Sequence, residues 1–183
     1  KKTHVIEIHA GQITTTDLTI SLSPTLNFEP FGGYSKIAAV ERHHNTGKIG
    51  VAVAKGYGIR NGAVASSVSH DSHNIIVIGD NDADMAIAVN EIIRTQGGYT
   101  VVENGKVYET LALPIMGLMS DAGFENVNEA LQRMIQKAHQ MGVASKIDPF
   151  VTLSFLALPV IPELRITPRG ICKMTAKGPA IVS

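Results

Sequence analysis

The chain has 183 residues, of which 44% are hydrophobic and 17% are charged, so it can form one domain with a substantial core and is not expected to be disordered. Sixteen Lys and Arg residues balance sixteen Asp and Glu residues, and a formal net charge of zero argues against a nucleic-acid binder and against a protein of acidic membrane surfaces. No apolar run is long enough to span a membrane, and the single cysteine, Cys172, leaves no internal disulfide, so a reducing, cytoplasmic compartment is expected.

The first half of the chain predicts β-strands. Residues 4–9 alternate between apolar and polar side chains. Runs of small and β-branched residues, which are typical of strands covered on both faces, follow at 36–40, 49–54, 63–68 and 74–79. Residues 10–34 mix Thr, Ser, Pro and Gly-Gly, so we expect an irregular extension there.

The periodicity changes at residues 80–82, which offer several N-cap candidates. They precede a helix whose apolar residues recur every three or four positions, and a Gly-Gly pair at 97–98 ends it. Residues 99–110 then read as a β-hairpin, because Asn104-Gly105 tolerates the positive φ angles of a type I′ turn.

A second helix is expected over residues 126–141, with Asn126 as N-cap, Glu129 as its capping-box partner and Gly142 as its end. Residues 150–158 are apolar and fit a helix or a strand. The tail from Thr175 is expected to fray. Together these elements predict an α+β fold for a single domain: a mixed, mostly antiparallel β-sheet packed with two to three helices.

Six consecutive polar residues, 69–74 (SHDSHN), interrupt two apolar strands and form what we call the polar turn. An imidazole titrates near neutral pH, and an adjacent carboxylate can fix its tautomer. The alternative is an ordinary turn in which Asp71 and Asn74 bond the local backbone, although the Gly, Pro, Lys and Glu common in solvent turns are absent here. The candidates for catalysis are His70, Asp71 and His73, and those for substrate binding are Ser69 and Asn74.

A second polar cluster, residues 41–45 (ERHHN), follows another predicted strand. Arg42 can bind an anion or a carboxylate, and Glu41 can transfer a proton. With His43, these two residues are further candidates for substrate binding. The alternative is a charged strand end before the turn at residues 46–47.

Other patterns carry less. Residues 56–62 nearly match a dinucleotide fingerprint, but Asn61 replaces the third glycine and a strand follows, so a flexible turn is expected. One cysteine cannot supply a closed zinc site, and the pattern of cytidine-type deaminases is missing, so no metal ligand is assigned. Ser120 and Asp121 could belong to a site, but a transition from a loop to the following helix explains them equally well.

Four segments resemble a known family. They are VASSVSHDSHN (64–74), ERH (41–43), LPIMGLMSD (113–121) and FVTLSFLALPVIPEL (150–164). Together they resemble the bacterial adenine deaminases of the amidohydrolase superfamily, and the first and last are long and specific. Only the C-terminal part of that family is matched. The metal-dependent (β/α)8 barrel that precedes it has no counterpart here, since no His-x-His pair occurs and a barrel needs about 250 residues.

The resemblance implies an enzyme that hydrolyses adenine to hypoxanthine and ammonia. A divalent metal, manganese or iron, would be held by the missing barrel and would activate a water; no cofactor is expected in this chain, which alone should be inactive. The implied partners are the barrel domain of the same polypeptide and adenine, without nucleic acid or membrane, and a homo-oligomer is compatible with the low charge. The polar turn would close or line the active site, with His70 or His73 bonding ring nitrogens or carrying a proton to ammonia and Asp71 orienting one of them.

Two other functions stay open. The domain can be a structural or dimerisation module whose motif docks on the barrel or on another subunit, or a stand-alone purine-binding module. A polar turn apart from any cavity favours docking, whereas convergence of its six groups on one open pocket favours catalysis.

Overall fold

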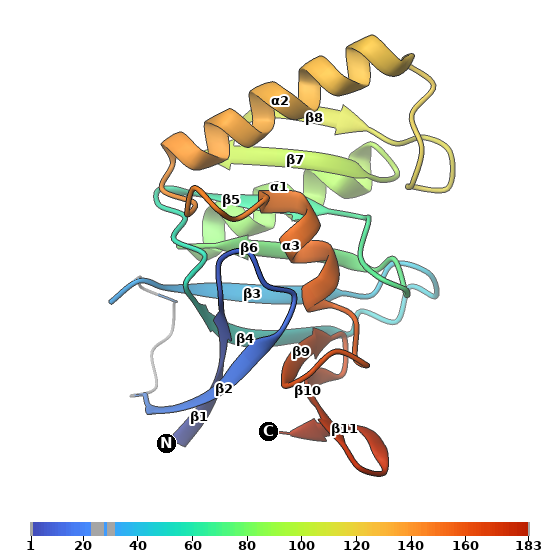
Figure 1. Ribbon diagram of the computed structural model, residues 1–183. Coiled ribbons are helices and arrows are strands. Elements are labelled where there is room, and N and C mark those ends of the chain that lie inside the picture. Colours follow the sequence, from blue (N-terminus) through green and yellow to red (C-terminus); the bar gives the residue numbers. More distant parts are fainter. Residues whose placement is uncertain (1, 23–27, 29–31, 183) are drawn as a thin grey trace.

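A mixed eight-stranded β-sheet forms the centre of the protein (Figure 1). The computed structural model describes residues 2–22, 28 and 32–182. The strand order is β2-β1-β4-β3-β6-β5-β7-β8, and among these neighbours β1 and β4 run parallel while the other pairs are antiparallel. The strands are β1 (Lys2–Ile8), β2 (Thr15–Ser21), β3 (Tyr34–Val40), β4 (Ile49–Lys55), β5 (Gly62–Ser66), β6 (Ile75–Gly79), β7 (Gly98–Glu103) and β8 (Lys106–Ala112).

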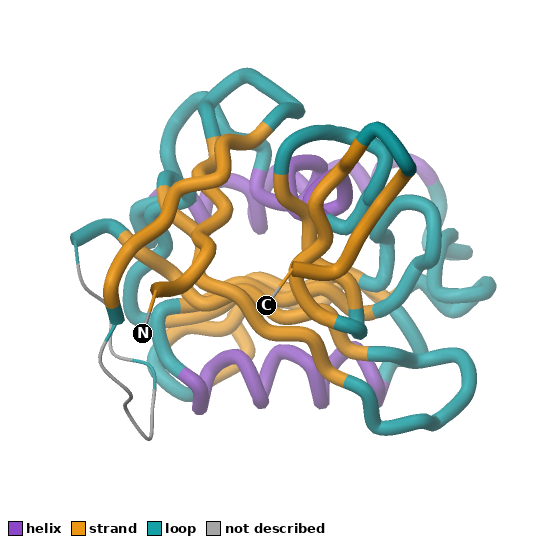
Figure 2. The backbone as a smooth tube through the Cα atoms, turned by 90° about the horizontal axis from the view of Figure 1, so that it is seen from below, coloured by secondary structure: helices purple, strands orange, loops and turns teal. Residues whose placement is uncertain are grey.

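Helices cover both faces of this sheet. Helix α1 (Asp82–Arg94) packs on one face, and α2 (Phe124–Gln140) and α3 (Pro149–Leu156) pack on the other. Figure 2 shows this layering, with a small second sheet on the side of α2 and α3. That antiparallel sheet consists of β9 (Leu164–Thr167), β10 (Gly170–Thr175) and β11 (Gly178–Val182). The predicted α+β class with a mostly antiparallel sheet is confirmed.

The central strands are apolar on both faces. Every residue of β5 and β6 is buried. Val64, Ile76 and Ile78 point into the core under α2 and α3, whereas Ala63 and Val77 point toward α1. Because successive strand residues alternate between faces, a sheet covered on both sides needs this continuous apolar pattern, which is why these strands could be predicted.

Helix α1 begins as expected. The side chain of Asn81 accepts a hydrogen bond from the backbone N–H of Asp84 at 2.8 Å, which makes Asn81 the N-cap. Buried Asp80 instead accepts from the backbone N–H groups of Asn61 and Gly62. The glycine-rich segment 56–61 is thus a turn between β4 and β5, as predicted.

Three expectations about local structure are wrong. Within the supposed irregular extension 10–34, residues Thr15–Ser21 form β2, which pairs with β1 along its length; residues 23–27 and 29–31 lie outside the described residues. Helix α2 begins at Phe124 rather than Asn126, and Asn126 donates to the carbonyl of Ala122. The tail from Thr175 forms strand β11 against β10 rather than fraying.

The ambiguous segment 150–158 is largely helical. Asp148 caps α3 by accepting from the backbone N–H groups of Phe150 and Val151, and Pro149 occupies the first turn, where its missing N–H costs nothing. Phe150 and Leu153 fill the core. Among the helices of the described residues, none is long and apolar enough to cross a membrane.

Candidate functional site

The register of the sheet brings three loops together at the same end of neighbouring strands. The last residue of β3, Val40, lies opposite Ile75, the first residue of β6, so the segment after β3 and the polar turn before β6 are neighbours. Strand β5 pairs with both β6 and β7. Gly98 of β7 lies opposite Ala112, the last residue of β8, so the loop at 113–121 starts at the same end of the strands.

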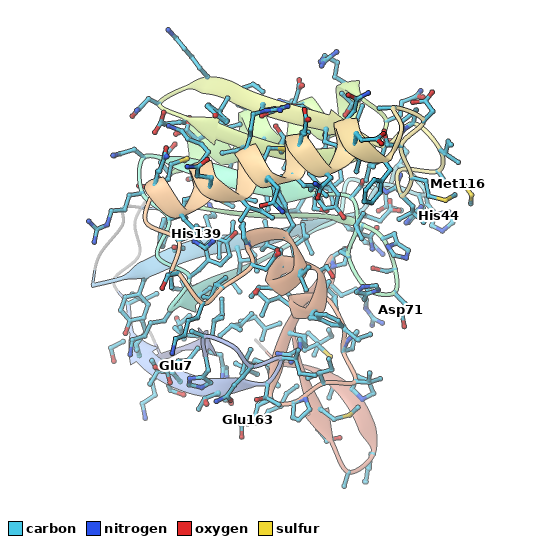
Figure 3. All side chains as sticks on the ribbon, turned by 45° about the horizontal axis from the view of Figure 1, so that its top comes forward. Glu7, His44, Asp71, Met116, His139 and Glu163 are labelled. Atoms are coloured by element: carbon cyan, nitrogen blue, oxygen red, sulfur yellow. The ribbon has the colours of Figure 1, made fainter. Side chains whose placement is uncertain are left out.

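Figure 3 shows this clustering in side-chain detail. Asp71 of the polar turn, His44 of the segment after β3 and Met116 of the loop after β8 are labelled on the same side of the molecule. Glu7 and Glu163 lie away from them. Residues that are far apart in the sequence therefore lie on one side of the molecule.

Ser69 and Asn74 close the base of the polar turn. The buried Ser69 hydroxyl donates to the carbonyl of Asn74 at 2.6 Å, and the carbonyl of Ser69 accepts from the N–H of His73 at 2.7 Å. The amide of Asn74 donates to the hydroxyl of Ser72 and accepts from the N–H of Arg42. These two side chains thus shape the turn, and their assignment as substrate ligands stays a prediction.

His70 and Asp71 stand at the outer end of the turn. Their side chains are 37% and 85% exposed, and the Nδ1 atom of His70 lies 3.6 Å from the carboxylate of Asp71. The backbone N–H of His70 donates to the carbonyl of Ser154 in α3. The backbone of His70 is therefore fixed by α3, and the carboxylate of Asp71 lies close to the imidazole beyond hydrogen-bond distance, so the orienting role of Asp71 stays a prediction.

The imidazole of His73 is partly buried. Its φ angle is 50°, and its buried Nδ1 atom has no hydrogen-bond partner among the residues that the structure describes. Burial, and then the proximity of His70 and Arg42, lower the pKa of His73. Since the unperturbed value is near 6.5, His73 is neutral at pH 7 and has one nitrogen that accepts and one that donates. Its ring meets the His70 ring edge to face, with centroids 5.8 Å apart.

Glu41 is engaged within its own loop. Its carboxylate accepts from the backbone N–H groups of His43, His44 and Thr46, and the Thr46 hydroxyl also donates to it. These hydrogen bonds lower the pKa of Glu41 to about 2. The carboxylate is therefore ionised at neutral pH and shapes the strand end, so the geometry favours the alternative interpretation of Glu41 over proton transfer.

Arg42 and His43 connect the strand end to the polar turn. The Nε atom of Arg42 donates to the carbonyl of His73 at 2.5 Å, and an Nη atom donates to the carbonyl of Met116 at 2.9 Å. The Nε2 atom of His43 donates to the carbonyl of Ser72 at 2.6 Å. All three acceptors are main-chain carbonyls.

The loop at 113–121 exposes large apolar side chains. This loop is one of the segments that carry the family resemblance, and none of its apolar residues was predicted to belong to a site. Ile115, Met116 and Met119 are 44%, 76% and 54% exposed, and Phe124 at the start of α2 is 81% exposed. Ser120 accepts from the N–H of Ala122, a local loop contact. A run of apolar residues in a loop without helical or strand periodicity was the signal that marks this surface.

The polar turn borders a depression at one end. This depression, of about 440 Å³, is lined partly by Glu41, His44 and Asn74, but not by His70, Asp71 or His73. Asn74 is therefore the residue of the polar turn that lines it. In the part of the chain that the structure describes, no three His, Cys, Asp or Glu side chains are grouped in a way that could hold a metal.

Comparison with known proteins identifies the family. The family model "Adenine deaminase C-terminal domain" matches residues 12–177. The chain belongs to this family. Curated adenine deaminases are similar to it: that of Desulfitobacterium hafniense is 49% identical over 168 residues, and those of Clostridium acetobutylicum and Bacillus subtilis are 53% and 42% identical over 140 and 170 residues.

The adenine deaminase C-terminal domain is a small part of these relatives. The three alignments cover 91%, 76% and 92% of this chain but 30%, 25% and 30% of the respective relative. The chain thus spans less than a third of their length. The matched region contains all four segments that carried the resemblance, which is confirmed.

Proposed function

We propose that this domain works as part of an adenine deaminase, in which its polar turn lines or closes an active site formed by the rest of the polypeptide. The names of the relatives and the share of their length that this chain spans support the enzyme class. The observation that carries the role of the turn is the buried Nδ1 atom of His73, which has no partner within the described part of the chain and lies beside the partly exposed His70. Unpaired buried polar atoms are costly and call for a partner.

In this proposal, the two imidazoles handle the purine and the leaving group. Hydrolysis replaces the amino group of adenine with the oxygen of water, and the departing nitrogen must gain a proton to leave as ammonia. Neutral His73 can bond a purine ring nitrogen without bringing a charge. His70, oriented by Asp71, is the candidate for carrying the proton to the leaving nitrogen.

The metal of this proposal lies outside the chain. A divalent ion, manganese or iron, would be held by a barrel in the rest of the enzyme and would supply an activated water. Because the described residues offer no group of metal ligands, we assign none of them to that ion. The contribution of this domain is to bind, orient and transfer protons. We also propose a cytoplasmic location for the enzyme.

The test uses the full-length enzyme with His70→Ala and His73→Ala. General acid–base or orienting groups typically contribute about 10²- to 10⁴-fold, so we expect kcat/KM for adenine to fall by at least about 100-fold in one of them. His9→Ala is the matched control, because the His9 ring is bonded to the Thr16 hydroxyl within the β1–β2 hairpin. Wild-type turnover in both turn variants, with the fold intact, would end the proposal.

A second candidate function is docking without a role in chemistry. The exposed Ile115, Met116, Met119 and Phe124 favour it, as does the absence of both turn imidazoles from the neighbouring depression. On this view the surface packs against the barrel or another subunit. Substituting Met116→Ser in the full-length enzyme would then weaken domain or subunit association and lower the melting temperature, while His70→Ala and His73→Ala would leave kcat unchanged.

A further inference from the structure

The guanidinium of Arg42 bonds two loops that are far apart in the sequence. It reaches the polar turn at the carbonyl of His73 and the 113–121 loop at the carbonyl of Met116. The backbone N–H of the same residue donates to the side chain of Asn74. Arg42, which follows β3, is therefore bonded to two residues of the polar turn and to the 113–121 loop.

Arg42 has no ion-pair partner within the described residues. A surface arginine that served only solubility would be free in solvent, and one that served as a salt bridge would meet a carboxylate. Arg42 is partly desolvated, and that burial lowers its pKa. A planar fork with several fixed N–H donors suits two separate carbonyls, whereas the single ammonium of lysine cannot copy its geometry.

Gly117 is shaped to receive this side chain. Its φ angle is +74°, and a Cβ atom at this position would lie 2.7 Å from one Nη atom of Arg42 and 2.9 Å from the other. The carbonyl of Gly117 is also fixed, because it accepts from the buried hydroxyl of Ser67 at 2.6 Å. The same hydroxyl accepts from the N–H of Gly98 in β7. The loop is thus anchored to the sheet beneath the guanidinium.

We propose that Arg42, seated on Gly117, is a positioning residue that holds the imidazole of His73 by fixing its carbonyl and joining the polar turn to the 113–121 loop. The inference rests on the proposed function of the turn. Arg42 acts on the reaction through His73 and makes no contact with the purine. A misplacement of about 1 Å in such a group costs on the order of 100-fold in rate.

The experiment compares Arg42→Lys, Arg42→Gln and Gly117→Ala in the full-length enzyme, with Arg94→Lys as the matched control. Arg94 lies on α1 and bonds Glu91 of its own helix. We expect kcat/KM to fall at least about 10-fold in Arg42→Lys and Gly117→Ala, with the larger effect on kcat, while the control keeps wild-type kinetics. Chemical shifts of the His73 ring in histidine-labelled enzyme should move in both variants.

The lysine and glutamine variants separate geometry from charge. The positive charge of Arg42 helps to lower the pKa of His73. Arg42→Gln removes this charge, so it should raise that pKa and move the acidic limb of the pH profile of kcat/KM to higher pH. Arg42→Lys keeps the charge and should not move the limb. Wild-type kcat/KM in Arg42→Lys, or His73 ring shifts that stay unchanged in it, would overturn the proposal. These results differ from failure of the proposed function, which would appear as wild-type activity in His70→Ala and His73→Ala.

Discussion

The imidazole of His70 lies against the ring of Phe155, with centroids 5.1 Å apart and planes inclined by 31°. The backbone N–H of His70 also donates to the carbonyl of Ser154, one residue earlier in α3. The polar turn is therefore supported by a helix that comes much later in the sequence. The contact joins the segments 64–74 and 150–164, which both carry the family resemblance.

Removal of the aromatic ring beneath His70 should lower activity more than stability. Phe155→Leu keeps an apolar side chain in α3 but removes the flat surface against which the imidazole lies. We expect kcat/KM of the full-length enzyme to fall about 10-fold and the free energy of unfolding by about 1–2 kcal/mol. Val151→Ala is the control, since Val151 lies one turn earlier on α3 and is 53% exposed. Unchanged kinetics in Phe155→Leu would show that the ring contact has no role.

Protonation of His73 should destabilise the fold. Burial lowers its pKa in the folded protein, whereas the unfolded chain has a value near 6.5. In the window between the two values the unfolded chain binds more protons, so stability is present above about pH 6.5 and is lost as the pH falls through the lower folded value. His73→Gln should flatten this dependence in urea unfolding between about pH 7 and pH 5. Equal slopes for His73→Gln and the wild type would contradict the assignment.

Arg165 should be essential for strand β2. Its guanidinium is fully buried and bonds the hydroxyl of Thr15 and the carbonyls of Ile13, Pro162 and Leu164. Burial lowers its pKa to about 10, so it stays charged at neutral pH. Arg165→Met removes the hydrogen bonds that the buried guanidinium donates to these four acceptors and should reduce the free energy of unfolding by about 2–4 kcal/mol.

The control for Arg165 is the exposed Arg169→Met, in the turn between β9 and β10, for which a change below about 0.5 kcal/mol is expected. Amide hydrogen exchange should also become faster in β2 of Arg165→Met. Loss of stability without faster exchange in β2 would show that Arg165 does not hold this strand.

Sequence patterns predicted the elements whose stability is local or whose burial is uniform. The alternating small and β-branched residues of β4 to β6, the Asn81 cap and the Asn104-Gly105 hairpin all carry their own signal. Strand β2 does not, because it is rich in Thr and mostly half-exposed or exposed. It is an edge strand held by distant residues: Thr15 exchanges backbone hydrogen bonds with Pro162 and Glu163, and Arg165 bonds its hydroxyl.

The position of the polar turn between β5 and β6 could be predicted from the sequence, whereas its contacts could not. The polar turn was recognisable because its composition is unusual for a solvent turn. The partners of Arg42 could not be recognised, since they are the carbonyls of His73 and Met116. Every residue has a main-chain carbonyl, so the sequence does not show which of them accept. The support of His70 by Phe155 likewise depends on how α3 packs, which the ambiguous apolar segment 150–158 did not reveal.

We propose that the polar turn faces the purine in the complete enzyme. The decisive measurement is a crystal structure of the full-length protein with hypoxanthine bound. We expect a ring nitrogen of His70 or His73 within about 3.2 Å of a polar atom of the purine. A product site whose surroundings lack both imidazoles, with the turn instead packed against another part of the polypeptide, would contradict it.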